Sequence, residues 1–554
     1  MFVDIQHSKP TVHPEWSKDA SCPQAAPISP SLHADLHNDL EDTYASNTFR
    51  LEAYESLGGA VRIPTEAYDD LKAPGQDPRW DIFVKLHEYL EQRFPLVHTT
   101  LQKTTVNTYA LVYHWQGSDL SLKPILLTAH QDVVPIDPST RHQWLQPPYS
   151  GLYDGKWIWG RGSCDDKPGL VGSLTAVESL LEKGFQPKRS VVLAYGIDEE
   201  RGGLQGGPPI RDHLLATYGE NAFSILIDEG GELDVRDDVV IASPAVAEKG
   251  HFDLRLTVNT IGGHSSVPPK HTSIGILAGL IVQLENHPHT PHLNRNDTYY
   301  TNLQCQAAYD PDLNEDLRSA IKESLKSDHA LKNLEAQLFE SDRRLVAIGS
   351  TTQAVDLISG GVKVNALPEE ASAVVNHRIA GYSSVSAVQT RIVEVLLPAA
   401  KKYNISIDAF GEEVDPSDDD DDDDEGLSRA YAGRVTLSDA FGTALEPAPI
   451  TPTSKNPAYE FISGTIIAVS KTSAKGKGSD KPVVVAPGFL IGNTDTRFYW
   501  KLTKNIFRYG HVDKYARYNG AHTVNEALEA EAFIELIRFF TTIILNADET
   551  KLLE

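Results

Sequence analysis

Acidic and histidine side chains recur in short motifs along this chain, and three of the motifs lie at or just after the end of a run of mainly apolar residues. The three pairs are residues 125–129 before His130-Gln131-Asp132, residues 191–195 before Asp198-Glu199-Glu200, and residues 224–227 before Asp228-Glu229. Imidazole nitrogen and carboxylate oxygen are both zinc ligands. The residue types therefore suggest a metal centre with hydrolytic chemistry.

Two further motifs, within residues 160–167 and 520–526, open amphipathic segments and add an aspartate and a histidine. Two zinc ions about 3.5–4 Å apart need one shared carboxylate and separate terminal ligands for each ion. Two imidazoles and three carboxylates meet this need and leave positions open for a bridging water. The candidate metal ligands are His130, Asp165, Glu200, Asp228 and His522.

Two acids beside these candidate ligands are expected to support catalysis. Asp132 lies two residues after His130 on an extended chain, so it points the same way and can accept the remaining imidazole N–H. Glu199 precedes the candidate ligand Glu200 and is free to accept a proton from water. Each motif alone is typical of a polar turn or a surface pair. Their joint occurrence after apolar runs favours an active site.

The apolar runs also predict the elements that position these side chains. Continuous valine, isoleucine and leucine runs are typical of buried parallel strands, and the carboxyl ends of such strands face the crevice that binds ligands. A helix is predicted after Asp166, because the apolar residues from Leu170 to Leu181 follow the 3.6-residue period, and Gly184 is expected to end it. We therefore predict an α/β enzyme.

Composition limits the class of protein. The 554 residues are enough for more than one domain. A formal charge of −27, from 77 acidic and 50 basic residues, argues against nucleic acid as a partner and favours small molecules or peptides. Three cysteines, Cys22, Cys164 and Cys305, are too few for a disulfide framework. No run approaches the ~18 apolar residues of a membrane span, and residues 1–20 lack the apolar core of a signal peptide.

Changes in the pattern of apolar and polar residues indicate a catalytic domain that is split by an insertion. From His251 onward apolar and polar residues alternate, which predicts an inserted α+β unit. A flexible turn is expected at residues 473–479, and a helix over residues 525–545 is expected to close the chain. The expected order is an extended N-terminal arm (1–45), the first catalytic part (46–249), the inserted domain (250–410), a solvated acidic loop (411–436) and the second catalytic part (437–554).

Several longer motifs carry a resemblance to a known family. They are Thr128-Ala129-His130-Gln131-Asp132-Val133-Val134-Pro135, Gly160-Arg161-Gly162 with Asp165-Asp166-Lys167, Asp198-Glu199-Glu200, Asp228-Glu229-Gly230, Gly262-Gly263-His264-Ser265-Ser266, Ile358 to Pro368, Gly492 to Arg497, and His522-Thr523-Val524-Asn525-Glu526. These motifs resemble the aminoacylase and glutamate carboxypeptidase family of di-zinc amidohydrolases, in particular its vacuolar carboxypeptidase S (Gly-Xaa carboxypeptidase) branch. The resemblance implies a zinc-peptidase domain with a mixed, mostly parallel sheet, split by a ferredoxin-like lid.

The same resemblance implies a role for each candidate ligand. Asp165 would bridge two Zn²⁺ ions, and Glu199 would be the general base. In relatives the fourth carboxylate position is an aspartate in some members and a glutamate in others, so Glu229 is an alternative to Asp228. Asp228 is preferred because it directly follows its apolar run. The terminal ligand pairs would be His130 with Asp228 and Glu200 with His522. In relatives the peptide bond that matches Asp165-Asp166 is commonly cis.

On the lid, the resemblance assigns His264 to stabilising the oxyanion, and a turn residue is the alternative interpretation. Asn365, Arg378 and Arg497 are candidates for binding a substrate carboxylate, since arginine offers a planar bidentate fork. A structural salt bridge is the alternative for each arginine. In some relatives the lid forms a homodimer and the histidine comes from the partner, so a homodimer through the lid is a possible assembly.

The expected reaction is metal-assisted hydrolysis of the C-terminal amide bond of short Gly-Xaa peptides, which releases a free amino acid. One alternative is hydrolysis or synthesis of N-acyl amino acids, and another is a non-catalytic metal-binding homologue. The resemblance implies a vacuolar enzyme. Relatives in this branch reach the vacuole by an N-terminal membrane anchor, which is not visible in this sequence.

Overall fold

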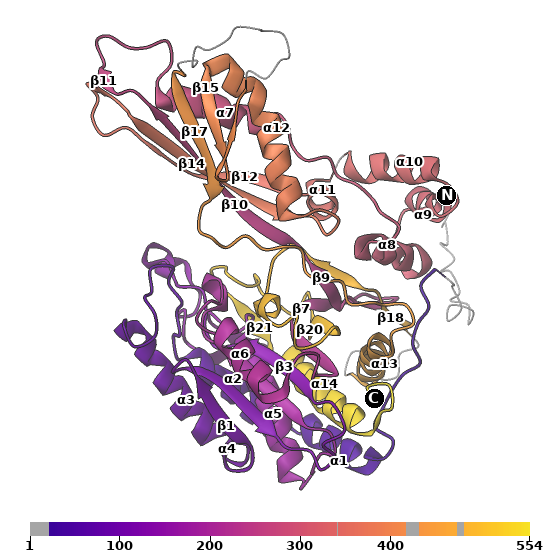
Figure 1. The fold of residues 1–554 in the computed structure, drawn as a ribbon. Coiled ribbons are helices and arrows are strands. Elements are labelled where there is room, and N and C mark those ends of the chain that lie inside the picture. Colours follow the sequence, from indigo (N-terminus) through magenta and orange to yellow (C-terminus); the bar gives the residue numbers. More distant parts are fainter. Residues whose placement is uncertain (1–20, 341, 417–430, 474–480) are drawn as a thin grey trace, which may run out of the picture.

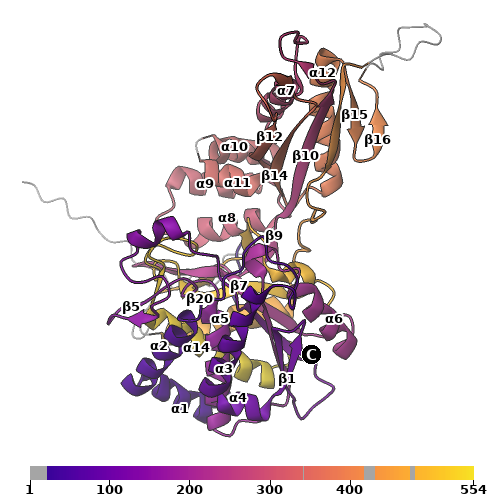
Figure 2. The same cartoon turned by 90° about the vertical axis from the view of Figure 1, so that its left-hand side faces the viewer.

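The protein folds into a catalytic domain and a lid that projects from it (Figures 1 and 2). The structure is a computed structural model, and it describes residues 21–340, 342–416, 431–473 and 481–554. The acidic run at 418–425 and most of the turn expected at 473–479 lie outside these residues. Among the described helices, none is both long and apolar enough to cross a membrane.

A ten-stranded mixed sheet forms the centre of the catalytic domain. Neighbouring strands β6, β3, β7 and β20 are parallel, whereas β1, β2 and β6 are antiparallel. The order is β1 (Gln102–Val106), β2 (Ala110–Trp115), β6 (Val191–Gly196), β3 (Ile125–His130), β7 (Ile225–Val235), β20 (Ile506–Asp513), β9 (Ala245–Glu248) and β19 (Gly488–Leu490), with β8 (Val240–Ala242) and β18 (Val483–Val485) attached beside β7.

Helices cover both faces of this sheet, so every residue of β3 and β6 is buried. Alternate strand residues such as Leu127 and Leu126 belong to separate cores on the two faces. The predicted helix after Asp166 is confirmed as α5, which Asp166 caps and Gly184 follows with φ +72°. The helices of the domain are α1 (Ala34–Ala45), α2 (Asn47–Val61), α3 (Ile82–Arg93), α4 (Pro95–Thr100), α5 (Lys167–Glu182), α6 (Gly207–Tyr218), α13 (Pro457–Thr472) and α14 (Ala530–Glu549).

The lid is a six-stranded, mainly antiparallel sheet with α7 (Ser273–Glu285) and α12 (Val385–Tyr403) packed on one face. A separate two-stranded antiparallel sheet, β11 (Gly263–His264) with β13 (Ala366–Leu367), forms the tip (Figure 1). The sheet order is β12 (Thr352–Gly360), β14 (Glu370–Ile379), β10 (Gly250–Thr260), β17 (Gly433–Asp439), β15 (Ile405–Ala409) and β16 (Glu412–Val414).

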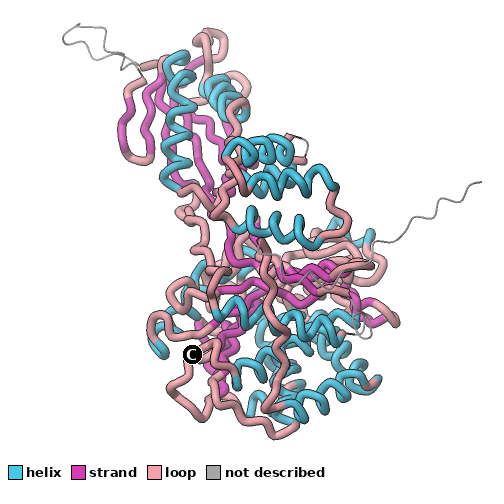
Figure 3. The backbone as a smooth tube through the Cα atoms, turned by 90° about the vertical axis from the view of Figure 1, so that its right-hand side faces the viewer, coloured by secondary structure: helices cyan, strands magenta, loops and turns pink. Residues whose placement is uncertain are grey.

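A helical unit with its own small core lies between the lid and the catalytic domain (Figure 3). Its helices are α8 (Thr298–Tyr309), α9 (Glu315–Ser324), α10 (Asp328–Phe339) and α11 (Arg343–Gly349). A disulfide joins Cys305 of α8 to Cys22 of the N-terminal segment. The sequence did not predict this pair, because its members are separated by 283 residues.

Three predicted boundaries differ from the structure. Residues 34–45 form α1 rather than an extended arm, since Leu40 and Tyr44 bury one narrow face and Tyr44 bonds Thr541 of α14 at 2.7 Å. The lid extends to β17, which pairs with β10 although it follows the acidic run. The final helix begins at Ala530, because the preceding strand β21 (Ala527–Glu529) pairs with β5 (Trp157–Trp159) next to β4 (Leu152–Tyr153).

Candidate active site

The carboxyl ends of neighbouring parallel strands bring the acidic motifs together. His130 is the last residue of β3, and the short helix η4 (Glu199–Arg201) follows the adjacent strand β6. Glu229 lies on β7, the other neighbour of β3. Asp165 comes from the loop before α5, and His522 from the loop after β20. Segments nearly 400 residues apart therefore meet at one edge of the sheet.

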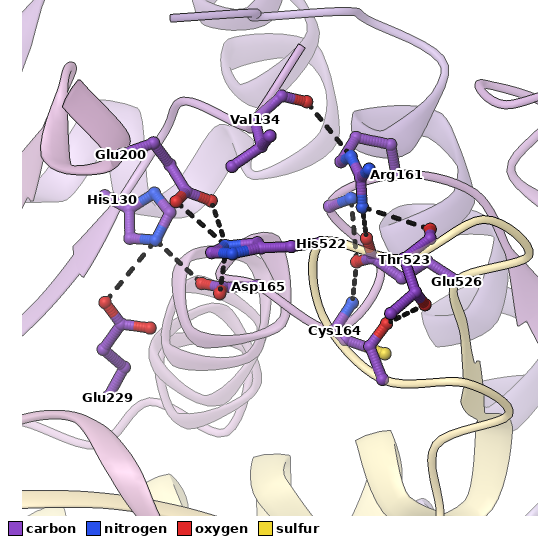
Figure 4. Close-up of polar contacts among 12 residues, drawn as sticks. His130, Val134, Arg161, Cys164, Asp165, Glu200, Glu229, His522, Thr523 and Glu526 are labelled. Atoms are coloured by element: carbon purple, nitrogen blue, oxygen red, sulfur yellow. Dashed lines mark hydrogen bonds and ion pairs between the residues drawn. The ribbon is translucent and has the colours of Figure 1, made fainter. Parts of the chain in front are cut away.

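Asp165 lies between the two histidines (Figure 4). Its Oδ1 is 3.0 Å from Nε2 of His130, and its Oδ2 is 3.2 Å from Nε2 of His522. The carboxylate oxygens of Glu200 lie 3.0 and 3.1 Å from the same nitrogen of His522. One carboxylate therefore faces two imidazoles with separate oxygens, as a bridging ligand of two metal ions would. The Asp165-Asp166 peptide bond is cis.

The fourth carboxylate beside the cluster is Glu229, not Asp228. Glu229 Oε1 lies 3.5 Å from His130 Nε2. Among the described residues, the donor groups that lie within 4.8 Å of one another are His130, Asp165 and Glu200, and His130, Glu199 and Glu229. Asp228, the acid preferred from the sequence, belongs to neither group, although it lies beside Glu229 on β7.

The buried acids shift the pKa values of one another and of His130. Burial raises the pKa of Glu229 well above its usual range, and the neighbouring Asp165 raises it further. Burial also raises the pKa of Glu199. Burial alone would lower the pKa of His130, but the nearby carboxylates of Glu229, Asp132 and Asp165 outweigh it and raise that pKa. Such a cluster favours bound positive charge.

Asp132 fastens the strand end to the loop that carries Glu199. Its carboxylate accepts hydrogen bonds from the backbone N–H groups of Glu199 at 3.2 Å and Glu200 at 3.1 Å. His130 Nδ1 lies 3.0 Å from the backbone carbonyl of Asp132 and 3.4 Å from its carboxylate. The expected support of His130 thus comes mainly from the backbone carbonyl, and the carboxylate positions the acid pair.

Glu526 supports the loop that carries Asp165. Its Oε1 accepts hydrogen bonds from the N–H groups of Gly162 at 3.0 Å and Cys164 at 2.9 Å, and its other oxygen pairs with Arg161 (Figure 4). Burial raises the pKa of Glu526 to about 7. The sequence contained Glu526 within a motif, but nothing in its spacing indicated a bond to residues more than 360 positions away.

The lid tip is remote from this cluster. His264 on β11 is exposed, its Nδ1 contacts Ser266 Oγ at 2.8 Å, and Asn365 immediately precedes the paired strand β13. Figure 1 shows β11 at the end of the lid farthest from the catalytic strands. Within a single chain, the structure therefore does not bring His264 and Asn365 to the metal-ligand cluster.

Arg378 and Arg497 lie near the junction of the lid and the catalytic domain. Arg378 Nη1 donates to Asn493 Oδ1 at 3.1 Å, and Arg497 donates to the backbone carbonyl of Gly202. Arg378 and His251 both contact Asn493. Burial lowers the pKa of His251, and the positive charges of Arg497 and Arg378 lower it further. Within the described ranges, neither arginine forms an ion pair with a carboxylate, which argues against the salt-bridge alternative.

Comparison with known proteins agrees with this architecture. The sequence model of peptidase family M20/M25/M40 matches residues 126–546. The chain belongs to this family. Carboxypeptidase S of Saccharomyces cerevisiae is 36% identical over 548 residues, which cover 98% of this chain and 91% of that protein. An N-fatty-acyl-amino acid synthase/hydrolase of Xenopus tropicalis is 30% identical over 518 residues, with 90% and 86% covered.

Solved structures of the family share the fold. An M20 metallo-carboxypeptidase from Sulfolobus solfataricus superposes with a TM-score of 0.58 at 17% identity, covering 90% of this chain and 99% of that one. A dinuclear metal-binding M20 peptidase from Bacillus subtilis gives 0.51 at 11% identity, covering 90% and 98%. The predicted family, fold class and enzyme class are confirmed: the chain is an M20 metallocarboxypeptidase homologue related to carboxypeptidase S.

Proposed function

We propose that this chain is a di-zinc carboxypeptidase that hydrolyses the C-terminal amide bond of short Gly-Xaa peptides and releases a free amino acid. The observation that carries the proposal is the position of Asp165, 3.0 Å from one imidazole and 3.2 Å from the other. One distance is measured from Oδ1 and the other from Oδ2 of the same carboxylate. A shared carboxylate of this kind is what two ions about 3.5–4 Å apart require.

The donor set fits zinc, since it consists of imidazole nitrogens and carboxylate oxygens. His130 and Glu229 would hold one ion, Glu200 and His522 would hold the other, and Asp165 would touch both. Zinc bound there would polarise the scissile carbonyl and lower the pKa of a bound water toward about 7.

Glu199 would move the proton. Its carboxylate lies within 4.8 Å of the ligand atoms of His130 and Glu229, and its backbone N–H donates a hydrogen bond to the carboxylate of Asp132. From this position Glu199 would take a proton from the attacking water and return it to the departing amine. Its pKa is raised by burial, which suits a group that must accept and release a proton near neutral pH.

Two arginines that have no carboxylate partner among the described residues support attack at a carboxyl terminus. The chain carries 77 acidic residues, yet Arg378 bonds the amide of Asn493 and Arg497 bonds a backbone carbonyl. Guanidinium groups bind carboxylates through parallel hydrogen bonds. A free substrate carboxylate at the junction of the lid and the catalytic domain would supply the missing partner.

A second candidate function is the hydrolysis or synthesis of N-acyl amino acids, which relatives at about the 30% level carry in their name. The amide chemistry is the same, and only the acyl side differs. The test compares kcat/KM for Gly-Leu, N-acetyl-leucine and a long-chain N-acyl-leucine on zinc-loaded protein. The proposal expects Gly-Leu to be the best substrate. A preference for either acyl-leucine would favour the second function, and zinc-loaded protein inactive on all three would favour a non-catalytic homologue.

We also propose a homodimer through the lid. The lid tip around β11 and β13 exposes four apolar side chains, and β12 is an edge strand of the lid sheet. Contiguous exposed apolar surface and an unpaired sheet edge are typical of a protein interface. In such a dimer, His264 and Asn365 would serve the partner's metal cluster. The exposed apolar residues at the tip are Ile261 (85%), Val267 (79%), Val362 (104%) and Val364 (96%).

A vacuolar location is proposed from the relation to carboxypeptidase S. The Cys22–Cys305 disulfide supports it, because disulfides form in the oxidising lumen of the secretory route and are rare in the cytosol. Immunofluorescence of the epitope-tagged protein against a vacuolar membrane marker tests the location. Cytosolic staining would contradict it.

A further inference from the structure

Asn493 stands where the lid meets the catalytic domain, and it contacts both. Its side-chain N–H donates to the backbone carbonyl of Lys249 at 2.5 Å, at the point where the chain enters the lid. Its Oδ1 accepts from Arg378 Nη1 at 3.1 Å and lies 3.2 Å from Nδ1 of His251. Arg378 and His251 are themselves cross-strand partners in the register of β10 and β14.

The backbone around Asn493 is fixed by a buried network. Thr494 and Thr496 donate hydrogen bonds to the two carboxylate oxygens of Glu248 at 2.8 and 3.1 Å. Arg508 donates to Glu248 at 3.0 Å, and the side chains of both are fully buried. The amide of Asn493 therefore has little freedom to move away from Arg378.

Arg378 is held by a neutral group although acids are abundant in this chain. Asn493 uses one of the five N–H donors of the guanidinium. No carboxylate within the described ranges pairs with Arg378. Among the residues that the structure describes, Lys249 likewise donates to backbone carbonyls and not to a carboxylate; its partners are Ala347 and Ser350, at 2.5 Å each. The hydrogen bonds at the junction thus orient the positive charges of Arg378 and Lys249 but do not neutralise them.

We propose that Asn493 is a positioning residue that aims Arg378 at the terminal carboxylate of the substrate while leaving the charge of Arg378 uncompensated. This inference rests on the proposed function, which places the substrate carboxylate at this junction. An amide is suited to the task, because it accepts a hydrogen bond from the guanidinium and does not compete as an ion. An aspartate at the same position would form an ion pair with Arg378 and occupy the fork that the substrate needs.

The test replaces Asn493 by aspartate and by alanine in the zinc-loaded protein. Asn302→Asp is the matched control, since Asn302 also donates to a backbone carbonyl, that of Pro487 at 3.0 Å, and accepts from a side chain, Gln306, at 2.7 Å. Two quantities are measured: KM and kcat for Gly-Leu, and the Kd of free leucine by calorimetry, with leucinamide for comparison.

We expect Asn493→Asp to raise both KM and the leucine Kd by about tenfold or more, with a much smaller change in kcat. Asn493→Ala should raise KM less, because Arg378 loses the hydrogen bond that orients it but gains no carboxylate that competes with the substrate. The preference for leucine over leucinamide should shrink in Asn493→Asp and persist in Asn302→Asp. Unchanged leucine binding in Asn493→Asp, or a fall in kcat alone, would overturn the proposal.

Failure of the proposed function would look different. If wild-type protein cleaves no Gly-Leu, the proposed peptidase activity fails, yet leucine and leucinamide binding still tests Asn493 without turnover. If Asn493→Asp does not fold, as judged by thermal unfolding, Asn493→Ala carries the test. Wild-type leucine affinity in that variant would also overturn the proposal.

Discussion

At the scale of single residues, the types and order of side chains predicted most of the cluster. His130, Asp165, Glu200 and His522 meet where parallel strands end, as the apolar runs before three of the motifs suggested. The position of Glu229 rather than Asp228 beside His130 was not predictable, because the two acids are adjacent residues of the same strand. Asn493 was also missed, since its partners lie on the lid, at least 115 positions away.

The role of Glu199 is tested by its isosteric variant. Glu199→Gln keeps the carboxylate and imidazole ligands but cannot take a proton, so zinc content should stay at the wild-type value while kcat for Gly-Leu falls by about 10²–10⁴-fold. Metal analysis and steady-state kinetics on the same preparation check this. Retained turnover with full zinc content would remove Glu199 from the reaction.

At the scale of elements, continuous apolar runs predicted β3, β6 and β7, and helical periodicity predicted α5. Elements that depend on distant partners were missed. The strand β17 joins the lid only by pairing with β10, and α1 is held by packing on α14. The link between Cys22 and Cys305 belongs to the same class, because two isolated cysteines carry no local signal.

The disulfide between the N-terminal segment and α8 should stabilise the fold without affecting catalysis. Cys22→Ser and Cys305→Ser should each lower the free energy of unfolding by about 2–4 kcal/mol, because the unfolded chain loses a constraint. The double variant should lose no more than either single one, since one bond is removed in all three. Denaturant titration measures the losses, and additive losses would contradict the bond.

His511 of β20 should make the fold less stable in acid. Burial lowers its pKa to about 3, whereas an unfolded histidine titrates near ~6.5. Between these values only the unfolded chain binds the proton, so the free energy of unfolding falls as pH drops below about 6.5. In His511→Phe, which keeps the stacking on Phe539, the decrease from pH 7 to pH 5 should be smaller by about 2 kcal/mol.

The comparison for this prediction is an exposed histidine. His329→Gln on α10 should show the same decrease between the two pH values as the wild type. An unchanged decrease in His511→Phe would mean that other groups control the acid sensitivity.

At the scale of the whole molecule, the candidate functional residues are divided between the catalytic domain and the lid. The metal-ligand cluster belongs to the catalytic domain, and Arg378 reaches the junction from the lid. The alternation after His251 predicted the inserted lid, but the sequence could not show where its tip points. Within one chain the lid tip lies far from the metal-ligand cluster (Figure 1). His264 could therefore reach a cluster only in a second chain, which is why dimerisation matters for the proposed function.

The proposed dimer makes a prediction for mixed subunits. His264→Ala and Glu199→Gln should each be inactive, and a refolded equal mixture should regain about one quarter of wild-type activity, since half the dimers are mixed and each has one complete site. Light scattering on the same samples gives the mass. A mixture that stays inactive although dimers form would contradict a histidine supplied by the partner.

The central claim is a pair of metal ions around Asp165. The most direct measurement is the anomalous scattering of crystals of the zinc-loaded protein, recorded above and below the zinc absorption edge. The account predicts two peaks about 3.5–4 Å apart, one against His130 and Glu229, the other against Glu200 and His522, with Asp165 between them. A single peak, or a peak coordinated by Asp228 in place of Glu229, would contradict it.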